Sequence, residues 1–559
     1  MPTSRRSRTA SRPRPLRPFP AKPSRIDAPL HRIMKRFRLA LLLAFGLLLL
    51  PRAESASLEL STATIADLQA AMDKGALTSE KLTQLYLARI DAYDQKGPGI
   101  RSVLFLNPGA LEEARTLDAE RKTKGPRSPL HGIPIVVKDV FDTHDMPTTG
   151  GYLPLKGVKP TKDAYVVRRL REAGAIILAK LNQSDWYAQP ENVAASTLGG
   201  NTHNPYDLTR TSGWSSSGTG AAVAAVFAAA GLGSETGFSI RTPTSDSNLF
   251  GLSTTSGLIS RDGQMWSYIT GERGGPMARS VLDLCLVLDV IAGFDSNDLW
   301  TAQSLGQMPE KTYVSFIDPK GLRGARVGVL KEAWDFNEPA ADPEIVEMAK
   351  KAIAVFGNNG AKVVDPVSLG IDLPRFLAAN SFPSRYERIA AIDHYLERQG
   401  PGYPFKDARA LLLDHPGVPG RPADKELIEK PVDLNRDPEY RATLQGKVAL
   451  RKALVELMDR YQLDALIYPH KLSKPLKLGP RTDPERQYTA NQTSPLTGLP
   501  AFIVPMGFTA DGNPVGLEIL GRPWSEPTLI KLASGFEAVT KNRKTPPSTP
   551  PLPGETVTY

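Results

Sequence analysis

One lysine and two serines of this chain stand in sequence contexts that suit catalysis. Ser215 lies in a Ser/Gly-rich loop and Ser239 in a second loop rich in Gly, Ser and Thr, and an apolar segment, 221–230, joins the two. Lys138 ends an apolar, strand-like run. Burial of such a lysine lowers its pKa toward a neutral amine that can accept a proton. The pattern indicates a reaction centre, although Gly/Ser loops are also ordinary connectors and a lysine at a strand end can extend into solvent.

The elements that must position these residues can be read from the same stretch. Segment 221–230 is too rich in alanine for a strand, so we predict a buried helix that ends at Gly231. Its small side chains permit close packing, which would hold the two serine loops against each other. The run 133–137 is predicted as the strand that carries Lys138.

Helical and strand patterns alternate along most of the chain. Thr64 and Thr78 are predicted N-caps of two amphipathic helices. The further expected elements are a helix at 110–122, a helix at 163–173 with a strand at 175–179, helix and strand within 448–470, and a strand pair within 499–520 that closes the sheet. This alternation predicts an α/β protein with helices on both faces of a mixed sheet.

Several short motifs together resemble the amidase signature family. They occur in the order expected for that family over most of residues 60–540, as GIPIVVKD at 132–139, SS at 215–216, GSETGFSIR at 233–241, GPMAR at 275–279 and GLPA at 498–501. The resemblance implies a single large α/β/α domain with a central mixed β-sheet covered by helices.

The resemblance also implies a Ser-Ser-Lys triad. Ser239 would be the nucleophile that forms an acyl-enzyme, because a serine hydroxyl is inert at neutral pH until another group takes its proton. Ser215 would relay that proton, and in the family a cis peptide bond holds the relay serine. Lys138 would be the terminal base, neutral in the resting enzyme, which later returns a proton to the leaving amine.

The residues just before the nucleophile would supply the oxyanion hole. The resemblance assigns this role to the backbone N–H groups of Thr236, Gly237 and Phe238, together with that of Ser239. Ser216 and Arg241 also match the family pattern. They are expected to contact and stabilise the residues of the triad. The alternatives are ordinary loop hydrogen bonding for Ser216 and a surface cation for Arg241.

The chain departs from the family pattern beside both serines. Trp214 and Phe238 occupy positions where glycine is usual. Backbone donors survive such a change where φ is negative, so the departure concerns the shape of the pocket more than the chemistry. Both rings are expected to line the substrate pocket, or else to turn away into the core.

The first 56 residues are expected to form a leader. Residues 1–55 carry a net charge of +11 while the whole chain carries +10, so the remainder is nearly neutral and nothing in it indicates nucleic-acid binding. The basic segment 34–38 precedes an apolar core at 39–50, which is typical of a signal peptide. The protein is therefore expected to be periplasmic or secreted, without stable membrane insertion after cleavage. A retained membrane anchor is the alternative.

The rest is divided into an amidase domain at 57–545 and a Pro-rich tail at 546–559 that cannot build a core. Residues 299–435 are expected to be the variable part that determines specificity. No metal or other cofactor is expected, because the histidines show no metal-ligand spacing and no phosphate-binding loop is present. The single cysteine, Cys285, is expected to be a buried structural thiol.

The sequence thus predicts an exported amidase that hydrolyses a small carboxamide or anilide to a carboxylic acid and an amine. The alternatives are a catalytically impaired relative that acts as a binding protein, and an esterase or carbamate hydrolase that uses the same site. No nucleic-acid partner is expected. The sequence leaves the oligomeric state open, with a homodimer as one candidate.

Overall fold

The computed structural model describes residues 57–187, 195–337, 341–380, 383–415, 421–479 and 492–559. The expected leader, 1–56, lies outside the described residues. From Ser57 to Tyr559 the chain forms one unit by its internal contacts. No helix in these described ranges has both the length and the apolar character needed to cross a membrane.

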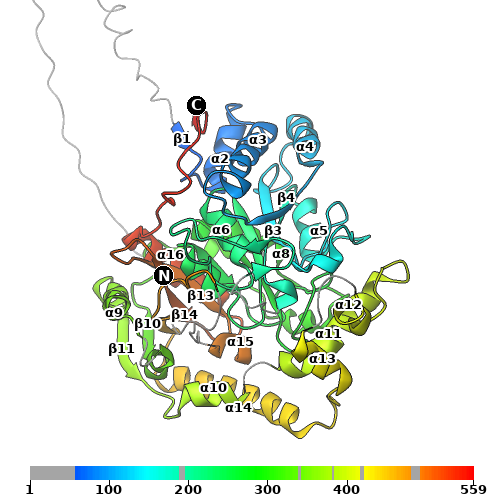
Figure 1. Ribbon diagram of the computed structural model, residues 1–559. Coiled ribbons are helices and arrows are strands. Elements are labelled where there is room, and N and C mark those ends of the chain that lie inside the picture. The colour runs from blue at the N-terminus through cyan, green and yellow to red at the C-terminus, as the bar shows by residue number, and fades with distance from the viewer. Residues whose placement is uncertain (1–56, 188–194, 338–340, 381–382, 416–420, 480–491) are drawn as a thin grey trace, which may run out of the picture. The chain divides into compact units, whose positions relative to one another are not determined.

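A mixed sheet of eleven strands runs through this unit (Figure 1). Its order is β11-β10-β12-β14-β13-β8-β9-β7-β3-β4-β2. Pairs β3–β4, β3–β7, β10–β11 and β10–β12 are parallel, and the other pairs are antiparallel. The strands are β2 Val103–Leu106, β3 Pro134–Lys138, β4 Ile176–Leu181, β7 Ala230–Glu235, β8 Phe250–Ser253, β9 Arg273–Ala278, β10 Arg326–Leu330, β11 Lys362–Val367, β12 Ala465–Pro469, β13 Ala501–Phe508 and β14 Pro514–Leu520.

The helices begin where the sequence offers caps. Thr64 and Thr78 each accept a hydrogen bond from a backbone N–H of the first helical turn, as predicted, and start α2 and α3. The α-helices are α2 Ile65–Asp73, α3 Ser79–Ile90, α4 Ala110–Lys124, α5 Tyr165–Glu172, α6 Ser217–Ala224, α7 Arg241–Asp246, α8 Val281–Ile291, α9 Pro343–Asn358, α10 Leu373–Asn380, α11 Ser384–Gln399, α12 Ala408–Leu412, α13 Pro422–Glu429, α14 Pro438–Arg460, α15 Thr493–Thr497 and α16 Glu526–Thr540.

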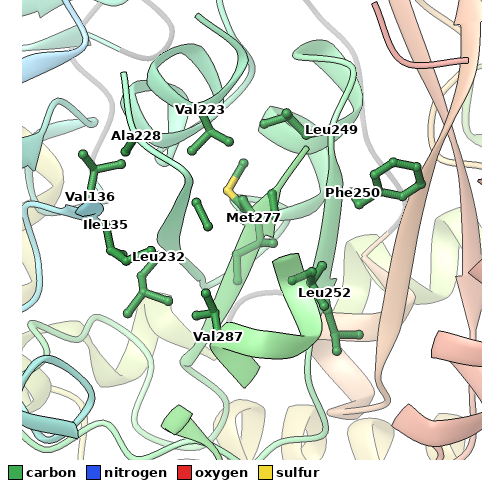
Figure 2. Close-up of a cluster of buried hydrophobic side chains, with 14 of the residues drawn as sticks. Ile135, Val136, Val223, Ala228, Leu232, Leu249, Phe250, Leu252, Met277 and Val287 are labelled. Atoms are coloured by element: carbon green, nitrogen blue, oxygen red, sulfur yellow. The ribbon is translucent and has the colours of Figure 1, made fainter. Parts of the chain in front are cut away.

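Helices α6 and α8 enclose the middle of the sheet. Figure 2 shows Val223 of α6 and Val287 of α8 at opposite ends of one buried cluster, with the strand residues Ile135, Leu232 and Met277 between them. Helix α6 contacts β3, β7 and β9, and α8 contacts β7, β8 and β9. The sheet is therefore covered by helices on both faces, as the sequence predicted.

The predicted helix at 221–230 is wrong at both ends. Helix α6 starts earlier, at Ser217, and ends at Ala224, and Ala230 already belongs to strand β7. Val226, with φ of 62°, takes a left-handed conformation that breaks the helix. Alanine is acceptable in β7 because the strand is buried throughout and small side chains suit a strand covered closely by helices.

Three further findings differ from the sequence expectations or add to them. Strands β13 and β14 do pair, but they lie inside the sheet rather than closing it, and the edges are β2 and β11. Strands β10 and β11 fall within 299–435, where no strand was expected. The Pro-rich end of the chain packs on the domain: β15 (Thr556–Thr558) pairs with β1 (Ser57–Glu59), and buried Glu555 forms a 2.9 Å ion pair with Arg89.

Candidate active site

Strand β3 delivers Lys138 into the interior of the protein. The lysine is fully buried, and its Nζ donates to Ser215 Oγ at 2.7 Å and to Ser234 Oγ at 3.0 Å. Ser215 belongs to the loop before α6, and Ser234 to the neighbouring strand β7. The structure thus joins two of the three predicted triad residues and adds a second hydroxyl that the sequence did not single out.

Burial sets the protonation state of this lysine. Desolvation lowers the pKa of Lys138 from its ordinary 10.5 to about 7, against the opposing effect of the Glu272 and Glu235 carboxylates. At neutral pH a large fraction of the amine is therefore uncharged. A neutral amine in contact with a serine hydroxyl can accept its proton.

Ser239 lies in the turn between β7 and α7, at the wall of a cavity. Its side chain is hydrogen-bonded to no described residue, whereas Ser215 is bound to Lys138. The structure therefore places a hydrogen-bonded Lys138–Ser215 pair in the interior and Ser239 at the wall of the cavity.

The expected cis peptide bond at Ser215 is wrong for this structure. Among the described residues only Asp365–Pro366 is cis, so both peptide bonds of Ser215 are trans. The trans form is the lower in energy for bonds that do not precede proline. The loop turns instead at Gly213, whose φ of 93° requires glycine, since a Cβ there would lie 2.6 Å from Pro243 N.

The backbone after β7 has the features of an oxyanion hole. Within the described residues, the N–H groups of Gly237, Phe238 and Ser239 donate to no protein acceptor, and all three residues line the cavity with Thr236. Thr236 Oγ1 donates to buried Glu272 at 2.7 Å, and Arg241 donates to the Gly237 carbonyl at 2.7 Å. The loop is therefore held by its carbonyl and side-chain groups, which leaves its amide donors for a ligand.

A buried carboxylate fixes the turn that follows the nucleophile. Glu235 accepts hydrogen bonds from the backbone N–H groups of Ile240 and Arg241, at 3.0 and 3.1 Å, and from Arg241 Nε at 2.9 Å. Although burial alone would raise the pKa of Glu235, Arg241 and Arg273 hold it below its ordinary value. The ionised carboxylate therefore anchors the residues directly after Ser239.

Arg241 is a buried structural cation rather than a surface one. Its guanidinium bridges Glu235 and Glu518, and Glu518 in turn contacts His470 Nδ1 at 2.8 Å. Ser216 has a comparable supporting position: its hydroxyl donates to the Ser234 carbonyl and accepts from the Ser234 N–H. Both residues thus contact the strand and loop next to the two serines, and their role in catalysis stays a prediction.

The two aromatic residues that stand where glycine is usual contact each other. The ring centroids of Trp214 and Phe238 lie 4.6 Å apart, edge to face, and both residues line the cavity beside Ser239. The sequence left open whether these rings line the pocket or turn away into the core, and in the structure both line the cavity. The pair brings together the loop of the relay serine and the loop of the nucleophile.

The cavity has a volume of about 280 Å³, slightly below the range of about 300–1,000 Å³ common for ligand pockets. Its other wall comes from α11 and from the start of α13, which lie side by side (Figure 1). This wall falls within 299–435, the region expected to determine specificity.

Sequence reasoning missed the polar groups around the triad. Ser234 and Glu235 lie within the motif at 233–241 but were given no role from the sequence. Glu272 and Glu518 lie in no quoted motif, and they reach the site through contacts with Thr236 and Arg241, which are distant in sequence. The only signal in the sequence was that Ser234 and Glu235 lie a few residues before Ser239.

Comparison with known proteins finds relatives along most of the chain. The family model described as Amidase matches residues 81–530. The A subunit of glutamyl-tRNA(Gln) amidotransferase from Myxococcus xanthus is 34% identical over 495 residues, covering 86% of this chain and 98% of the relative. A probable amidase of Arabidopsis thaliana is 30% identical over 503 residues, covering 88% and 93%.

A solved structure shows the same fold. The native peptide amidase of Stenotrophomonas maltophilia superposes with a TM-score of 0.77 at 35% identity, covering 89% of this chain and 99% of that one. This confirms the predicted α/β class and the amidase signature fold. The chain belongs to the amidase signature family and is a hydrolase that acts on C–N amide bonds.

Proposed function

We propose that this protein hydrolyses a small carboxamide or anilide through an acyl-enzyme on Ser239, with Ser215 and Lys138 as the proton relay. The observation that carries the proposal is the 2.7 Å contact between Lys138 Nζ and Ser215 Oγ inside a buried site. Trp214, which precedes Ser215, lines the same cavity as Ser239. Gly237 and Phe238 line it too, and their N–H groups donate to no acceptor among the described residues.

Acylation begins with attack of Ser239 Oγ on the carbonyl carbon of the amide. The Ser239 proton moves to Ser215, and Ser215 passes its own proton to neutral Lys138. The oxyanion is stabilised by the amide groups of Gly237, Phe238 and Ser239. Lys138 then returns a proton through Ser215 to the nitrogen, the C–N bond breaks, and the amine leaves.

Deacylation repeats these steps with water. The same relay removes a proton from water as it attacks the ester carbon, and Ser239 recovers its proton when the acid departs. Overall one amide and one water yield one carboxylic acid and one amine. An ester or carbamate can enter the same sequence because attack at the carbonyl is common to all three.

Support for the substrate class comes from the relatives and from the cavity. The structural neighbours include a peptide amidase and a bacterial aryl acylamidase, and the latter, at 22% identity, shares only the fold. The cavity is small and is lined by the Trp214–Phe238 pair, which suits a compact amide.

We further propose that the protein is exported and acts in the periplasm or outside the cell. The basis is the basic segment 34–38 followed by the apolar core 39–50. Cell fractionation with N-terminal sequencing of the mature protein tests this. Cleavage near residues 53–57 is expected, and an intact N-terminus in the membrane fraction would favour the retained anchor.

The triad is tested by covalent labelling with a fluorophosphonate, which reacts with activated serines. The purified protein should be labelled on Ser239 and should release amines from small amides, anilides and peptide amides. Ser239→Ala should lose both properties, and Ser473→Ala, a serine outside the cavity, should keep both. Labelling at another residue, or turnover by Ser239→Ala, would contradict the assignment.

A further inference from the structure

The wall of the cavity that comes from α11 and α13 is strongly basic. Arg385 and Arg388 of α11 and Arg421, which precedes α13, all line the same cavity as Ser239. One carboxylate, that of Asp424, lines it with them. Three arginines and one carboxylate therefore line the space next to Ser239, and the carboxylate contacts two of them, Arg388 and Arg421.

Asp424 orients two of these arginines without using all of their donors. Its Oδ1 accepts from Arg388 Nε at 2.9 Å, and its Oδ2 accepts from Arg421 Nη2. Arg388 Nη1 also donates to the Trp186 carbonyl at 2.7 Å. In the described part of the chain, Arg388 Nη2 and Arg421 Nη1 have no acceptor. Both arginines are thus held in place, and each keeps N–H groups that can donate to a ligand in the cavity.

The charges near this wall do not balance at neutral pH. Although burial raises the pKa of Asp424, Arg388 and Arg421 hold it below its ordinary value, so Asp424 is ionised. Burial raises the pKa values of the neighbouring Asp185 and of Glu272, behind the oxyanion loop, to about 7, so neither is a full negative charge.

Arg421 is the arginine of this wall most affected by burial and by the neighbouring positive charge. Burial and the charge of Arg388 lower the pKa of Arg421, and Asp424 offsets them only in part. Desolvated cations are costly unless an anion or hydrogen-bond acceptors compensate them. A ligand that brings a negative charge to this wall would provide that compensation.

We propose that the enzyme selects amide substrates that carry a carboxylate away from the scissile bond, and that Arg421 and Arg388 bind this carboxylate. The planar guanidinium fork matches a carboxylate in geometry, which favours this anion. The Trp214–Phe238 pair lines the same cavity and supplies an apolar surface for the chain between the two groups. The inference rests on the proposed amidase activity at Ser239.

The reaction itself is unchanged by the selected group. Water is consumed, the C–N bond is broken, and the distal carboxylate leaves the site unaltered. The acid product is therefore a dicarboxylate if the charge lies on the acyl side. It is an amino acid if the charge lies on the leaving group.

The test compares matched 4-nitroanilides with the full-length protein. Malonyl, succinyl and glutaryl 4-nitroanilides are each paired with the neutral acyl anilide of equal chain length, and the release of 4-nitroaniline is followed. A parallel pair, the anilides of 4-aminobenzoate and of aniline, places the charge on the leaving group. At least one charged member should exceed its neutral partner in kcat/KM by about tenfold or more.

Variants identify the residues responsible for this preference. Arg421→Gln should reduce the charged-to-neutral ratio by about tenfold, and Arg385→Gln by less. Arg421 is 34% exposed in its side chain, so the substitution is compatible with folding, which a melting curve checks. Asp424→Asn should raise the ratio. Lys425→Gln, which removes an exposed charge of the same helix outside the cavity, should leave it unchanged.

A binding measurement separates this inference from the amidase proposal. Glutarate or 4-aminobenzoate should slow fluorophosphonate labelling of Ser239, and added salt or Arg421→Gln should weaken this protection. Two results would overturn the anion site while leaving the amidase proposal intact. In both, Ser239 is labelled normally. In the first, no charged substrate has a higher kcat/KM than its neutral partner, and in the second, Arg421→Gln does not change the charged-to-neutral ratio. Absence of both labelling and turnover would overturn both.

Discussion

Replacing Lys138 by methionine should inactivate the enzyme and stabilise its fold at neutral pH. The lysine is fully buried, and burial lowers its pKa from 10.5 to about 7. Since one pKa unit corresponds to about 1.4 kcal/mol, the folded state disfavours the charged amine by roughly 5 kcal/mol. Methionine has a similar length and no charge to desolvate.

The sign of the pH dependence follows from proton binding. Between pH 7 and 10.5 the unfolded chain holds a proton on Lys138 that the folded chain has released, so stability rises with pH over this window. The cost of the lysine is complete below pH 7 and vanishes above 10.5. Methionine also forfeits the hydrogen bonds to Ser215 and Ser234, worth about 1 kcal/mol each, which leaves a net gain of about 3 kcal/mol at pH 7.

Urea unfolding of both proteins at pH 7, 8.5 and 10 measures this difference. The advantage of Lys138→Met should be greatest at pH 7 and should disappear or reverse by pH 10. Lys425→Met, at an exposed lysine, should show no such trend. If Lys138→Met were destabilised equally at all three pH values, the folded protein would not disfavour the charged form of Lys138. The argument that Lys138 is a neutral base would then fail.

Four further outcomes are expected. A chain that begins at Ser57 should be soluble with unchanged kcat/KM, because every group of the site lies later; an insoluble product would contradict the leader interpretation. Phe238→Gly should raise the ratio of kcat/KM for a bulky acyl anilide to that for acetanilide by about tenfold; an unchanged ratio would contradict a role for the ring in selectivity. Lys138→Ala and Ser215→Ala should each lower kcat on the order of 10⁴-fold, and the double variant hardly further; additive losses would exclude a shared relay. In the wild type the rise of activity with pH is expected near pH 7. Glu272→Gln should move this rise to lower pH, because the Glu272 carboxylate raises the pKa of Lys138. A shift to higher pH would contradict this.

The residues proposed to perform the chemistry could be named from the sequence because the patterns that mark them are local. Lys138 ends an apolar run, and the two serine loops flank one helix, so the residues and their order are visible without the fold. The exact ends of that helix were not predictable. Composition alone does not distinguish a buried Ala-rich helix from the buried strand that follows a left-handed residue at Val226.

The half that binds the substrate depends on contacts between distant segments. Glu387 of α11 accepts from Thr270 N and Oγ1, and the adjacent Arg388 reaches the Trp186 carbonyl. These contacts tie α11 to Thr270 and Trp186, yet neither partner belongs to a motif in the sequence. In the sequence, Arg421 and Asp424 resemble the charged residues found at many helix starts. The proposed role in binding follows only from the cavity that they line together with Ser239.

The structure explains Trp214 and Phe238, the two residues that stand where glycine is usual in the family, by a single contact. In sequence Trp214 and Phe238 are separate departures from a family pattern, and each alone would suggest a damaged site. Their edge-to-face contact shows that the two changes fit each other: the ring beside the relay serine packs on the ring beside the nucleophile. Because both rings also line the cavity, the pair shapes one wall while the arginines shape the other. A site that keeps all three residues of the proposed triad and has two matched walls is better explained by altered substrate selection than by loss of function.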